Sequence, residues 1–214
     1  MLNKNYPIGT NVKEIKGLDQ GSHDWVLWRH DHIGSSDASI VLDMNPWKNP
    51  IQLWNEKVAE LDNKPQNDAM RLGSLFEPKI RQWYSEQTGL EFSPIVCEHD
   101  SISYLGASLD GISIDRKHAI EIKCGASAYR MALDGEIPLY YQCQIQHIYY
   151  VCGVDTLTYI AADPNEKGET ILISVEPDQY FFDMMFREYP PFWHCVENFI
   201  SPNVAQRKYK VCND

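Results

Sequence analysis

The sequence predicts an α/β fold in which helices flank a central mixed β-sheet. Short segments rich in β-forming residues are concentrated in the middle of the chain, and patterns typical of helices precede them, interrupt them once and follow them. No internal repeat or low-complexity tract breaks this order. Because the 214 residues contain no Ser/Gly/Pro-rich linker, we expect a single domain over 1–214, with a core at 22–176, C-terminal helices at 177–200 and a tail at 201–214.

Four helices are predicted before residue 90. Ser22 is a suitable N-cap for the first, polar groups at 35–37 can cap the second, and Pro50 fits the first position of the third. Gly89 closes the fourth, because glycine tolerates the left-handed conformation at a helix end. The predicted helices cover 23–29, 38–42, 51–61 and 69–88.

From residue 90 onward the sequence consists of short β-rich runs separated by polar residues and glycine. Pro138 and Gly153 bound an apolar helix within this region. Two further strands follow, and then two helices that Pro190-Pro191 should separate. The predicted strands are 90–97, 104–108, 111–114, 119–124, 157–161 and 170–175, and the predicted helices are 138–152, 178–189 and 192–200.

The composition is typical of a globular protein, with 43% hydrophobic and 23% charged residues. Without a long apolar run or a basic N-terminus of the secretory type, we expect no membrane segment and a cytoplasmic protein. The net charge of −11 argues against a protein that coats nucleic acid indiscriminately. Any DNA contact should therefore be local, with a few basic residues in a groove and divalent cations offsetting the carboxylates.

The cysteines are widely spaced and form no C-x-x-C pair. This spacing argues against a zinc ribbon, a closely spaced disulfide framework and an iron–sulfur cluster. We expect reduced thiols, mostly in the core, at Cys97, Cys124, Cys143, Cys152, Cys195 and Cys212.

Three carboxylates and one lysine are the strongest candidates for chemistry. Glu77 lies on the fourth predicted helix, Asp110 precedes a glycine between two predicted strands, and Glu121-Ile122-Lys123 lies on a strand. Because side chains alternate along a strand, Glu121 and Lys123 should share one face. Magnesium prefers oxygen ligands and needs only a few convergent carboxylates when a substrate phosphate completes its shell. The set therefore predicts a metal-dependent phosphodiesterase.

In such a site Asp110 and Glu121 would bind the metal, and the backbone carbonyl of Ile122 would add an oxygen ligand. Glu77 would complete a second metal site, and Lys123 would position or activate the attacking water. A Glu-x-Lys sequence on a strand is also common without any catalytic role, so the neighbouring motifs have to be considered.

Four ordered motifs around these residues resemble the PD-(D/E)XK nuclease superfamily and, more narrowly, the phage lambda exonuclease and YqaJ-like viral recombinase family. The resemblance covers about 22–153, including an opening block that consists of Trp25, Arg29, 33–37 and Asn45-Pro46-Trp47. The four motifs are Gly73-x-x-x-Glu77, Ala107-Ser108-x-Asp110-Gly111, Glu121-Ile122-Lys123-Cys124 and Tyr141-x-x-Gln144-x-Gln146.

The resemblance implies a restriction-endonuclease-like core that uses one or two Mg²⁺ ions, with Mn²⁺ as a substitute. Asp110 and Glu121 match the metal ligands, Glu77 the helix carboxylate and Lys123 the catalytic lysine. Gln144, with Tyr141 one helical turn earlier, would lie near the attacking water or the metal hydration shell, and helix packing is the alternative role for both residues. Leu109 stands where the superfamily motif has proline, which leaves the local turn uncertain.

The resemblance also implies a pocket for the 5′-phosphate of a DNA end, formed by Arg29, Ser36 and Ser108. Ser35 is the rival of Ser36, helix capping is the alternative role for Ser36, and a surface charge on the helix is the alternative for Arg29. A strand-separating wedge would fall on Met70, with Leu72 beside it, and core packing is the alternative for both. Basic residues that could contact DNA phosphates, or simply be solvated, are Lys48, Arg71, Lys79, Arg81 and Arg130.

The function implied is a metal-dependent exonuclease that degrades linear double-stranded DNA in the 5′→3′ direction. It would supply a 3′ single strand to a phage-type single-strand annealing protein. The resemblance implies that the protein is of phage, prophage or bacterial origin. Relatives form a ring of three subunits, so a homotrimer is expected. Two alternatives remain: a structure-specific or nicking endonuclease of the same fold, and a non-catalytic DNA-end-binding module.

Overall fold

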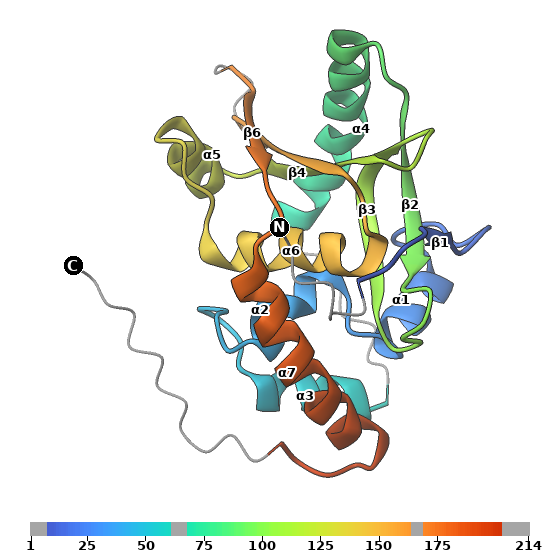
Figure 1. The fold of residues 1–214 in the computed structure, drawn as a ribbon. Coiled ribbons are helices and arrows are strands. Elements are labelled where there is room, and N and C mark those ends of the chain that lie inside the picture. The colour runs from blue at the N-terminus through green and yellow to red at the C-terminus, as the bar shows by residue number, and fades with distance from the viewer. Residues whose placement is uncertain (1–7, 61–67, 164–168, 203–214) are drawn as a thin grey trace.

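The computed structural model describes residues 8–60, 68–163 and 169–202, and for 68–72 and 74 it describes the backbone alone. Its centre is a six-stranded sheet whose strands lie in the order of the chain, β1-β2-β3-β4-β5-β6 (Figure 1). Neighbouring strands are antiparallel except β4 and β5, which are parallel. The strands are β1 (Lys13–Glu14), β2 (Phe92–Glu98), β3 (Gly106–Ser113), β4 (His118–Cys124), β5 (Thr156–Ala162) and β6 (Ile171–Val175).

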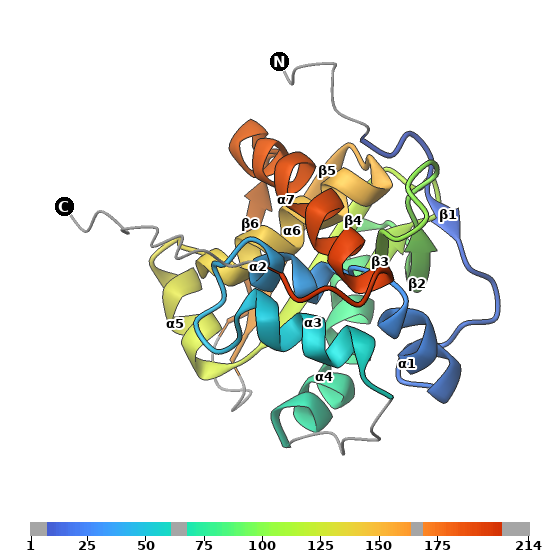
Figure 2. The same cartoon turned by 90° about the horizontal axis from the view of Figure 1, so that it is seen from below.

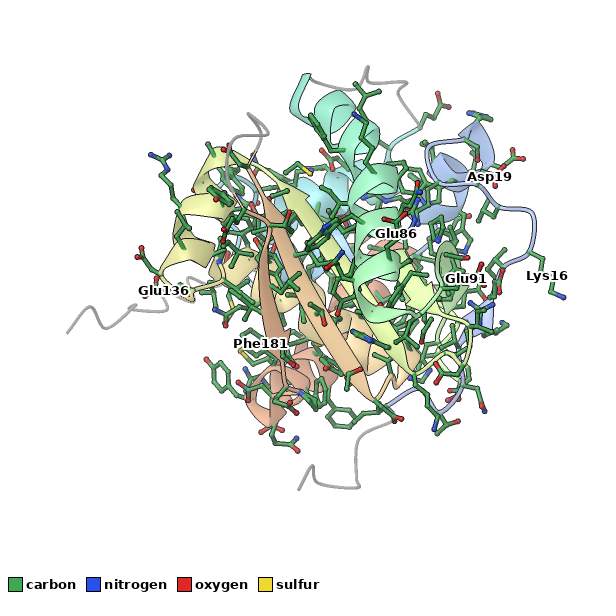
Figure 3. The ribbon with its side chains drawn as sticks, turned by 90° about the horizontal axis from the view of Figure 1, so that it is seen from above. Lys16, Asp19, Glu86, Glu91, Glu136 and Phe181 are labelled. Atoms are coloured by element: carbon green, nitrogen blue, oxygen red, sulfur yellow. The ribbon has the colours of Figure 1, made fainter. Side chains whose placement is uncertain are left out.

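The helices lie on both faces of this sheet. Seen from below, α2, α3, α6 and α7 lie in front of it (Figure 2), and seen from above α4 lies across it (Figure 3). The described helices are α1 (His23–His30), the 3-10 turn η1 (Ser35–Asp37), α2 (Ala38–Val41), α3 (Pro50–Val58), α4 (Asp68–Thr88), α5 (Ala126–Leu133), α6 (Leu139–Cys152) and α7 (Gln179–Glu197).

The two faces of the sheet carry separate hydrophobic clusters. The larger cluster packs β3 and β5 against α2, α6 and α7, and the smaller packs Ile120 and Ile122 of β4 against α4. Because side chains alternate along a strand, Glu121 must point away from α4, toward the face covered by α6. The carboxylate of Glu121 therefore faces α6.

His147 joins α6 to β3 and α7 inside the larger cluster. Its Nε2 donates to the carbonyl of Gly106 at 2.9 Å, and its Nδ1 accepts from the hydroxyl of Tyr189 at 2.8 Å. Burial lowers the pKa of His147 to about 4, so the ring is neutral and satisfied within the core. Gly106 also allows Trp28 of α1 to approach β3, because a Cβ at this position would lie 2.4 Å from the Trp28 ring.

The α/β class with a mixed sheet and flanking helices is confirmed. Ser22 accepts a hydrogen bond from the backbone N–H of Trp25 as the predicted N-cap, and Pro50 opens α3 as expected. Gly89 and Gly153 follow α4 and α6 with positive φ angles of 69° and 60°. The short elements β1 and α5 were not predicted.

The prediction of two strands at 104–108 and 111–114 is wrong, because β3 runs unbroken through Asp110-Gly111. These two residues favour turns in isolation. Here glycine is required by packing, since a Cβ on Gly111 would lie 2.8 Å from the Ile120 side chain of the adjacent strand. A pair that resembles a turn is therefore a site of close approach between strands.

The predicted break at Pro190-Pro191 is also wrong, because α7 continues through both prolines. Each proline removes one backbone donor, a loss that usually ends or kinks a helix. Tyr189, Phe192 and Trp193 flank the prolines and are buried in the larger cluster. Burial of this apolar stripe outweighs the lost hydrogen bonds.

None of the described helices is long and apolar enough to cross a membrane. Charged side chains such as Lys16, Asp19 and Glu136 lie at the edge of the molecule and point outward (Figure 3). The five cysteines in the described ranges are free thiols, of which Cys97, Cys143 and Cys152 are buried, whereas Cys212 lies outside those ranges.

Candidate active site

The end of the ladder between β3 and β4 brings two of the predicted carboxylates together. The strands pair at Gly111 with Ile120, which sets the preceding residue Asp110 beside Glu121. Beyond this point the backbone N–H of Ile122 donates to Oδ2 of Asp110 at 2.7 Å. The aspartate side chain thus takes the place of a main-chain acceptor, and Ile122 is connected to the site through its N–H group. Arg81 of α4 donates to the carbonyl oxygen of Asp110.

Glu121 is fully buried at the centre of the site. Its Oε1 accepts hydrogen bonds from the ammonium group of Lys123 and from Nε2 of Gln144, the latter at 2.6 Å. Its Oε2 is buried and has no hydrogen-bond partner among the described residues. The structure therefore brings Gln144 of α6 to the carboxylate of Glu121. The Lys123 nitrogen lies 5.0 Å from the centre of the Tyr141 ring.

Burial and mutual repulsion raise the pKa values of the carboxyl groups in the site. Burial and the nearby Asp110 raise the pKa of Glu77 to about 7, and the same two causes raise the pKa of Glu121 to about 8. Burial also raises the pKa of Asp110, against the opposing effect of Lys123 and Arg81. These shared effects place Glu77 of α4 in the same electrostatic cluster as the two strand carboxylates.

For Lys123, burial and the neighbouring charges act on the pKa in opposite directions. Burial alone would lower its pKa, but the carboxylates of Glu121 and Asp110 outweigh this effect and raise it. The neighbouring Cys124 thiol has its pKa raised to about 11 by burial and by Glu77 and Asp110. The site is therefore a region of negative potential that the cations Lys123 and Arg81 partly neutralise.

The donor chemistry of this cluster fits a hard divalent cation. Carboxylate oxygens of Asp110, Glu121 and Glu77 are the ligands that magnesium prefers, and a cation would satisfy the unpaired Oε2 of Glu121 and relieve the repulsion that raises the carboxyl pKa values. Among the described residues no three His, Cys, Asp or Glu side chains already converge in a metal-binding arrangement. In the structure, Oε1 of Glu121 accepts a hydrogen bond from Lys123 instead.

Tyr159 belongs to the surroundings of the site and was not predicted. It is paired with Glu121 across the parallel strands β4 and β5, and its hydroxyl is buried without a hydrogen-bond partner in the described part of the chain. Burial raises its pKa. The only signal in the sequence was the alternation of the predicted strand 157–161, which does not reveal that this strand lies beside β4.

A second polar cluster forms around Arg29. Its guanidinium donates to Oγ of Ser36 at 2.8 Å and lies 4.7 Å from the Trp25 ring centre, and the Trp25 Nε1 donates to Oγ of Ser108 at 2.8 Å. Trp25 therefore joins the predicted members Arg29, Ser36 and Ser108 into one group. Ser108 and Asp110 lie two residues apart on β3, roughly 7 Å along the strand, so the two clusters are neighbours.

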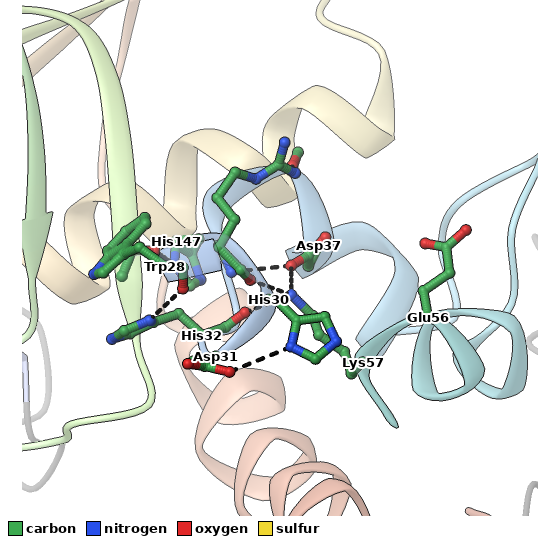
Figure 4. A network of polar contacts seen from close by, with 12 residues as sticks. Trp28, His30, Asp31, His32, Asp37, Glu56, Lys57 and His147 are labelled. Atoms are coloured by element: carbon green, nitrogen blue, oxygen red, sulfur yellow. Dashed lines mark hydrogen bonds and ion pairs between the residues drawn. The ribbon is translucent and has the colours of Figure 1, made fainter. Parts of the chain in front are cut away.

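A buried ion pair between Lys57 and Asp37 (Figure 4) lies next to this second cluster. Lys57 of α3 lies 2.8 Å from Oδ2 of Asp37 and donates to the carbonyl oxygens of Arg29 and His32, each at 2.6 Å. These three acceptors use the three donors of the ammonium group. Burial alone would raise the pKa of Asp37, but Lys57 and Arg29 hold it below its ordinary value. The pair was not predicted, because its partners are far apart in the sequence.

The remaining predicted residues have different placements. Ser35 is buried, its hydroxyl has no partner among the described residues, and it is Ser36 that contacts Arg29. Met70 and Leu72 lie on α4, and their side chains, like that of Arg71, are outside the described part of the structure. The basic candidates with described side chains each have a contact within the protein. Arg81 donates to the carbonyl of Asp110, and Lys48 forms an ion pair with Glu56 at 2.6 Å. Lys79 lies over the Phe76 ring, and Arg130 donates to a backbone carbonyl of its own helix.

Residues 24–155 match the model of the YqaJ-like viral recombinase domain. The chain belongs to the YqaJ-like viral recombinase family. The match contains both clusters, from Trp25 to Gln144. The chain is 28% identical over 184 residues to the uncharacterised protein YqaJ of Bacillus subtilis (strain 168), covering 84% of this chain and 57% of that protein. It is 25% identical over 170 residues to the uncharacterised protein R354 of Acanthamoeba polyphaga mimivirus, covering 72% of this chain and 31% of that protein.

Solved structures share the fold of this family member. The alkaline exonuclease LHK-Exo of Laribacter hongkongensis superimposes with a TM-score of 0.73 at 22% identity, over 84% of this chain and 94% of that one. A phage-related exonuclease of Haemophilus somnus superimposes with a TM-score of 0.58 at 12% identity, over 83% of this chain and 98% of that one. The chain therefore shares its fold with these two exonucleases.

The raised pKa of Glu121 predicts a pH-dependent stability in chelator. Folding favours the protonated carboxyl, so this contribution is complete below pH 4.5 and is lost as the pH rises through about 8. Glu121→Gln removes the titration, and its melting temperature should rise relative to the unsubstituted protein across this window, by roughly 2–4 °C per kcal/mol. Calorimetry from pH 5 to 9 measures the difference, with surface Glu136→Gln as the control. Parallel melting curves for the two proteins would contradict the prediction.

The buried ion pair predicts a large cost for Lys57→Met. Removing the ammonium group leaves Asp37 buried and unpaired, which should lower the free energy of unfolding by about 3–5 kcal/mol. Lys48→Met, at the more exposed pair with Glu56, is the matched control and should change it by about 0–1 kcal/mol. Urea titration measures both, and adding Asp37→Asn to Lys57→Met should recover part of the loss. Equal effects of the two lysine substitutions would rule out a structural role for the buried pair.

Proposed function

We propose that this protein is a magnesium-dependent exonuclease that degrades linear double-stranded DNA from its 5′ ends. The observation that carries the proposal is the convergence of Asp110, Glu121 and Lys123, from two adjacent strands, with Gln144 from α6. Membership of the YqaJ-like viral recombinase family and the fold shared with alkaline exonucleases support it.

Asp110 and Glu121 would hold the magnesium ion, with the carbonyl of Ile122 and the carboxylate of Glu77 as further oxygen donors. When bound, the ion supplies Lewis-acid polarisation of the scissile phosphate and neutralises its charge. Lys123 contributes a cation beside the reacting phosphate and would position the attacking water. Gln144 orients the carboxylate of Glu121 through its 2.6 Å hydrogen bond, and Tyr141 borders the lysine nitrogen. Burial of these groups strengthens each electrostatic contact.

The polarity of the proposed reaction follows from the Arg29 cluster. A guanidinium beside serine hydroxyls suits a terminal phosphate, because it offers charged, directional donors. Ser108 of this cluster precedes Asp110 on the same strand, so a 5′-phosphate bound here would hold the adjoining phosphodiester near the carboxylates. Cleavage would then remove nucleotides from the 5′ end and leave a 3′ single strand.

A phage-type single-strand annealing protein would use that 3′ strand, and a ring of three subunits would retain the DNA during repeated cleavage. Both proposals come from the family resemblance. A trimer would also account for tight association with DNA despite a net charge of −11. Light scattering on the purified protein tests the ring, which requires three times the mass of the 24.7 kDa chain.

The deciding experiment is digestion of linear duplex DNA labelled at either end, in magnesium and in chelator. The proposal expects early release of the 5′ label, late release of the 3′ label and no release in chelator. Covalently closed circular DNA is the second substrate. Its cleavage at a rate similar to that of linear DNA would favour the nicking or structure-specific endonuclease, and binding without any cleavage would favour the end-binding module.

Lys123→Ala should abolish cleavage, because it removes the cation at the reacting phosphate. We expect the rate to fall at least about 100-fold while affinity for DNA ends changes only a few-fold. Rates on linear duplex and binding by fluorescence anisotropy separate the two effects. Turnover by this variant comparable to that of the unsubstituted protein would exclude the proposed role of the lysine.

Arg29→Ala should reduce the preference for 5′-phosphorylated over 5′-hydroxyl ends by about 10-fold or more, since a hydrogen bond to a charged group contributes roughly 1.5–3 kcal/mol. The ratio of initial rates on the two substrates is the measurement. Arg116→Ala, which removes a surface guanidinium paired with Glu14, is the control and should leave the ratio unchanged. An unchanged ratio in Arg29→Ala would remove the pocket assignment.

A further inference from the structure

A row of aromatic rings leads from the catalytic lysine to the surface. The Lys123 nitrogen lies 5.0 Å from the centre of the Tyr141 ring, the Tyr141 and Tyr140 ring centres are 4.4 Å apart, and the Tyr140 and Trp47 ring centres are 4.8 Å apart. Each step is a direct contact. The outermost ring is therefore within a few nucleotides of the proposed reaction centre, since one DNA strand advances about 3.4 Å per nucleotide.

Trp47, at the end of this row, is unusually exposed for its residue type, with 71% of its surface accessible. The edge-to-face contact with Tyr140, at an interplanar angle of 69°, holds the ring without covering it. A large apolar ring in this state has most of its contact area still available.

Hydrogen bonds of Asn45 hold the turn that carries Trp47 and connect it to a buried residue. Oδ1 of Asn45 accepts hydrogen bonds from the backbone N–H groups of Trp47 and Lys48, each at 3.0 Å, and Nδ2 of Asn45 donates to Oγ of the buried Ser39 at 3.0 Å. Pro46 restricts the backbone between Asn45 and Trp47. Because the ring is already positioned, a ligand that stacks on it would not have to order the turn.

The turn offers a ligand an exposed aromatic ring, whereas its cation is already engaged in an ion pair. Lys48, the adjacent cation, forms an ion pair with Glu56 at 2.6 Å, and the chain as a whole carries a charge of −11. Electrostatic attraction to phosphates is therefore a weak source of affinity at this position. Stacking on nucleobases does not depend on positive charge, and it contributes about 1–3 kcal/mol per base at aromatic side chains.

We propose that Trp47 and Tyr140 form a stacking platform for an unpaired nucleobase of the DNA strand held at the catalytic site. The base must be unpaired, because in a duplex the faces of each base are covered by its neighbours. This inference rests on the proposed nuclease function and adds to it a contact with the base, made on one side of the catalytic residues while the Arg29 cluster contacts the terminal phosphate.

The test compares binding of short 5′-phosphorylated single strands that contain either normal bases or abasic sites at successive positions from the 5′ end. Fluorescence anisotropy is measured in chelator, so that no hydrolysis occurs. Trp47→Leu should weaken binding of the normal strand about 5- to 100-fold and weaken binding of a strand with abasic sites at the contacted positions less than about twofold. Trp47→Phe should retain most of the affinity, because phenylalanine can still stack.

Tyr180→Leu is the matched control, because Tyr180 is also exposed and packs edge-on against a second aromatic ring, on α7. It should leave binding of both strands unchanged. Equal loss of affinity for the normal and abasic strands in Trp47→Leu, or no loss for either, would overturn the proposal. A change in molar mass by light scattering without any dependence on the bases would also overturn it and would assign the ring to contact with a second copy of the chain.

Failure of this inference can be distinguished from failure of the proposed function. If the unsubstituted protein releases the 5′ label from linear duplex in magnesium but Trp47→Leu binds every strand normally, only the platform is wrong. If the unsubstituted protein hydrolyses no DNA, the nuclease assignment fails, and with it the basis for placing a strand at the site.

Discussion

The accumulation of carboxyl groups beside one lysine, where the ladder between β3 and β4 ends, is the constraint on which the rest of the structure depends. Asp110 and Glu121 are nearly or fully buried, and their repulsion is opposed by Lys123 and by hydrogen bonds from Ile122 and Gln144. Such a cluster costs stability, because desolvation of charged groups is only partly repaid inside a protein. The core on both faces of the sheet must supply that stability, and a bound cation would reduce the cost.

The second polar cluster is stabilised differently. Lys57 and Asp37 form a fully satisfied ion pair beneath Arg29, and the pair fixes the backbone carbonyl of Arg29 itself. The cluster around Glu121 keeps a carboxylate oxygen without a hydrogen-bond partner among the described residues, whereas the cluster around Arg29 is held in place by neighbouring charges. Strand β3 connects them through Ser108 and Asp110. Under the proposed function, a protein with a net charge of −11 would contact DNA through one local guanidinium, a metal ion and the rings of Trp47 and Tyr140.

Much of this arrangement could be predicted from the sequence. The alternation in Glu121-Ile122-Lys123 predicted a shared face for the glutamate and lysine, and the structure brings their side chains into contact. Capping by Ser22, the start of α3 at Pro50 and the ends of α4 and α6 at glycines depend on local backbone chemistry, so they were predictable. The errors at Gly111 and at Pro190-Pro191 have the opposite origin, since close packing there overrides local preferences.

The sequence by itself determined the α/β class, the shared face of Glu121 and Lys123 on β4 and the candidate residues of both clusters, because these follow from local propensity, two-residue alternation and motif order. Only the tertiary structure decided that Trp25 links Arg29 to Ser108, that Lys57 neutralises Asp37, and that Tyr159 lies beside Glu121. It also placed Trp47 at the end of a row of rings that starts at Lys123. Each of these contacts joins residues from different elements, and their proximity depends on how the whole chain packs around the sheet.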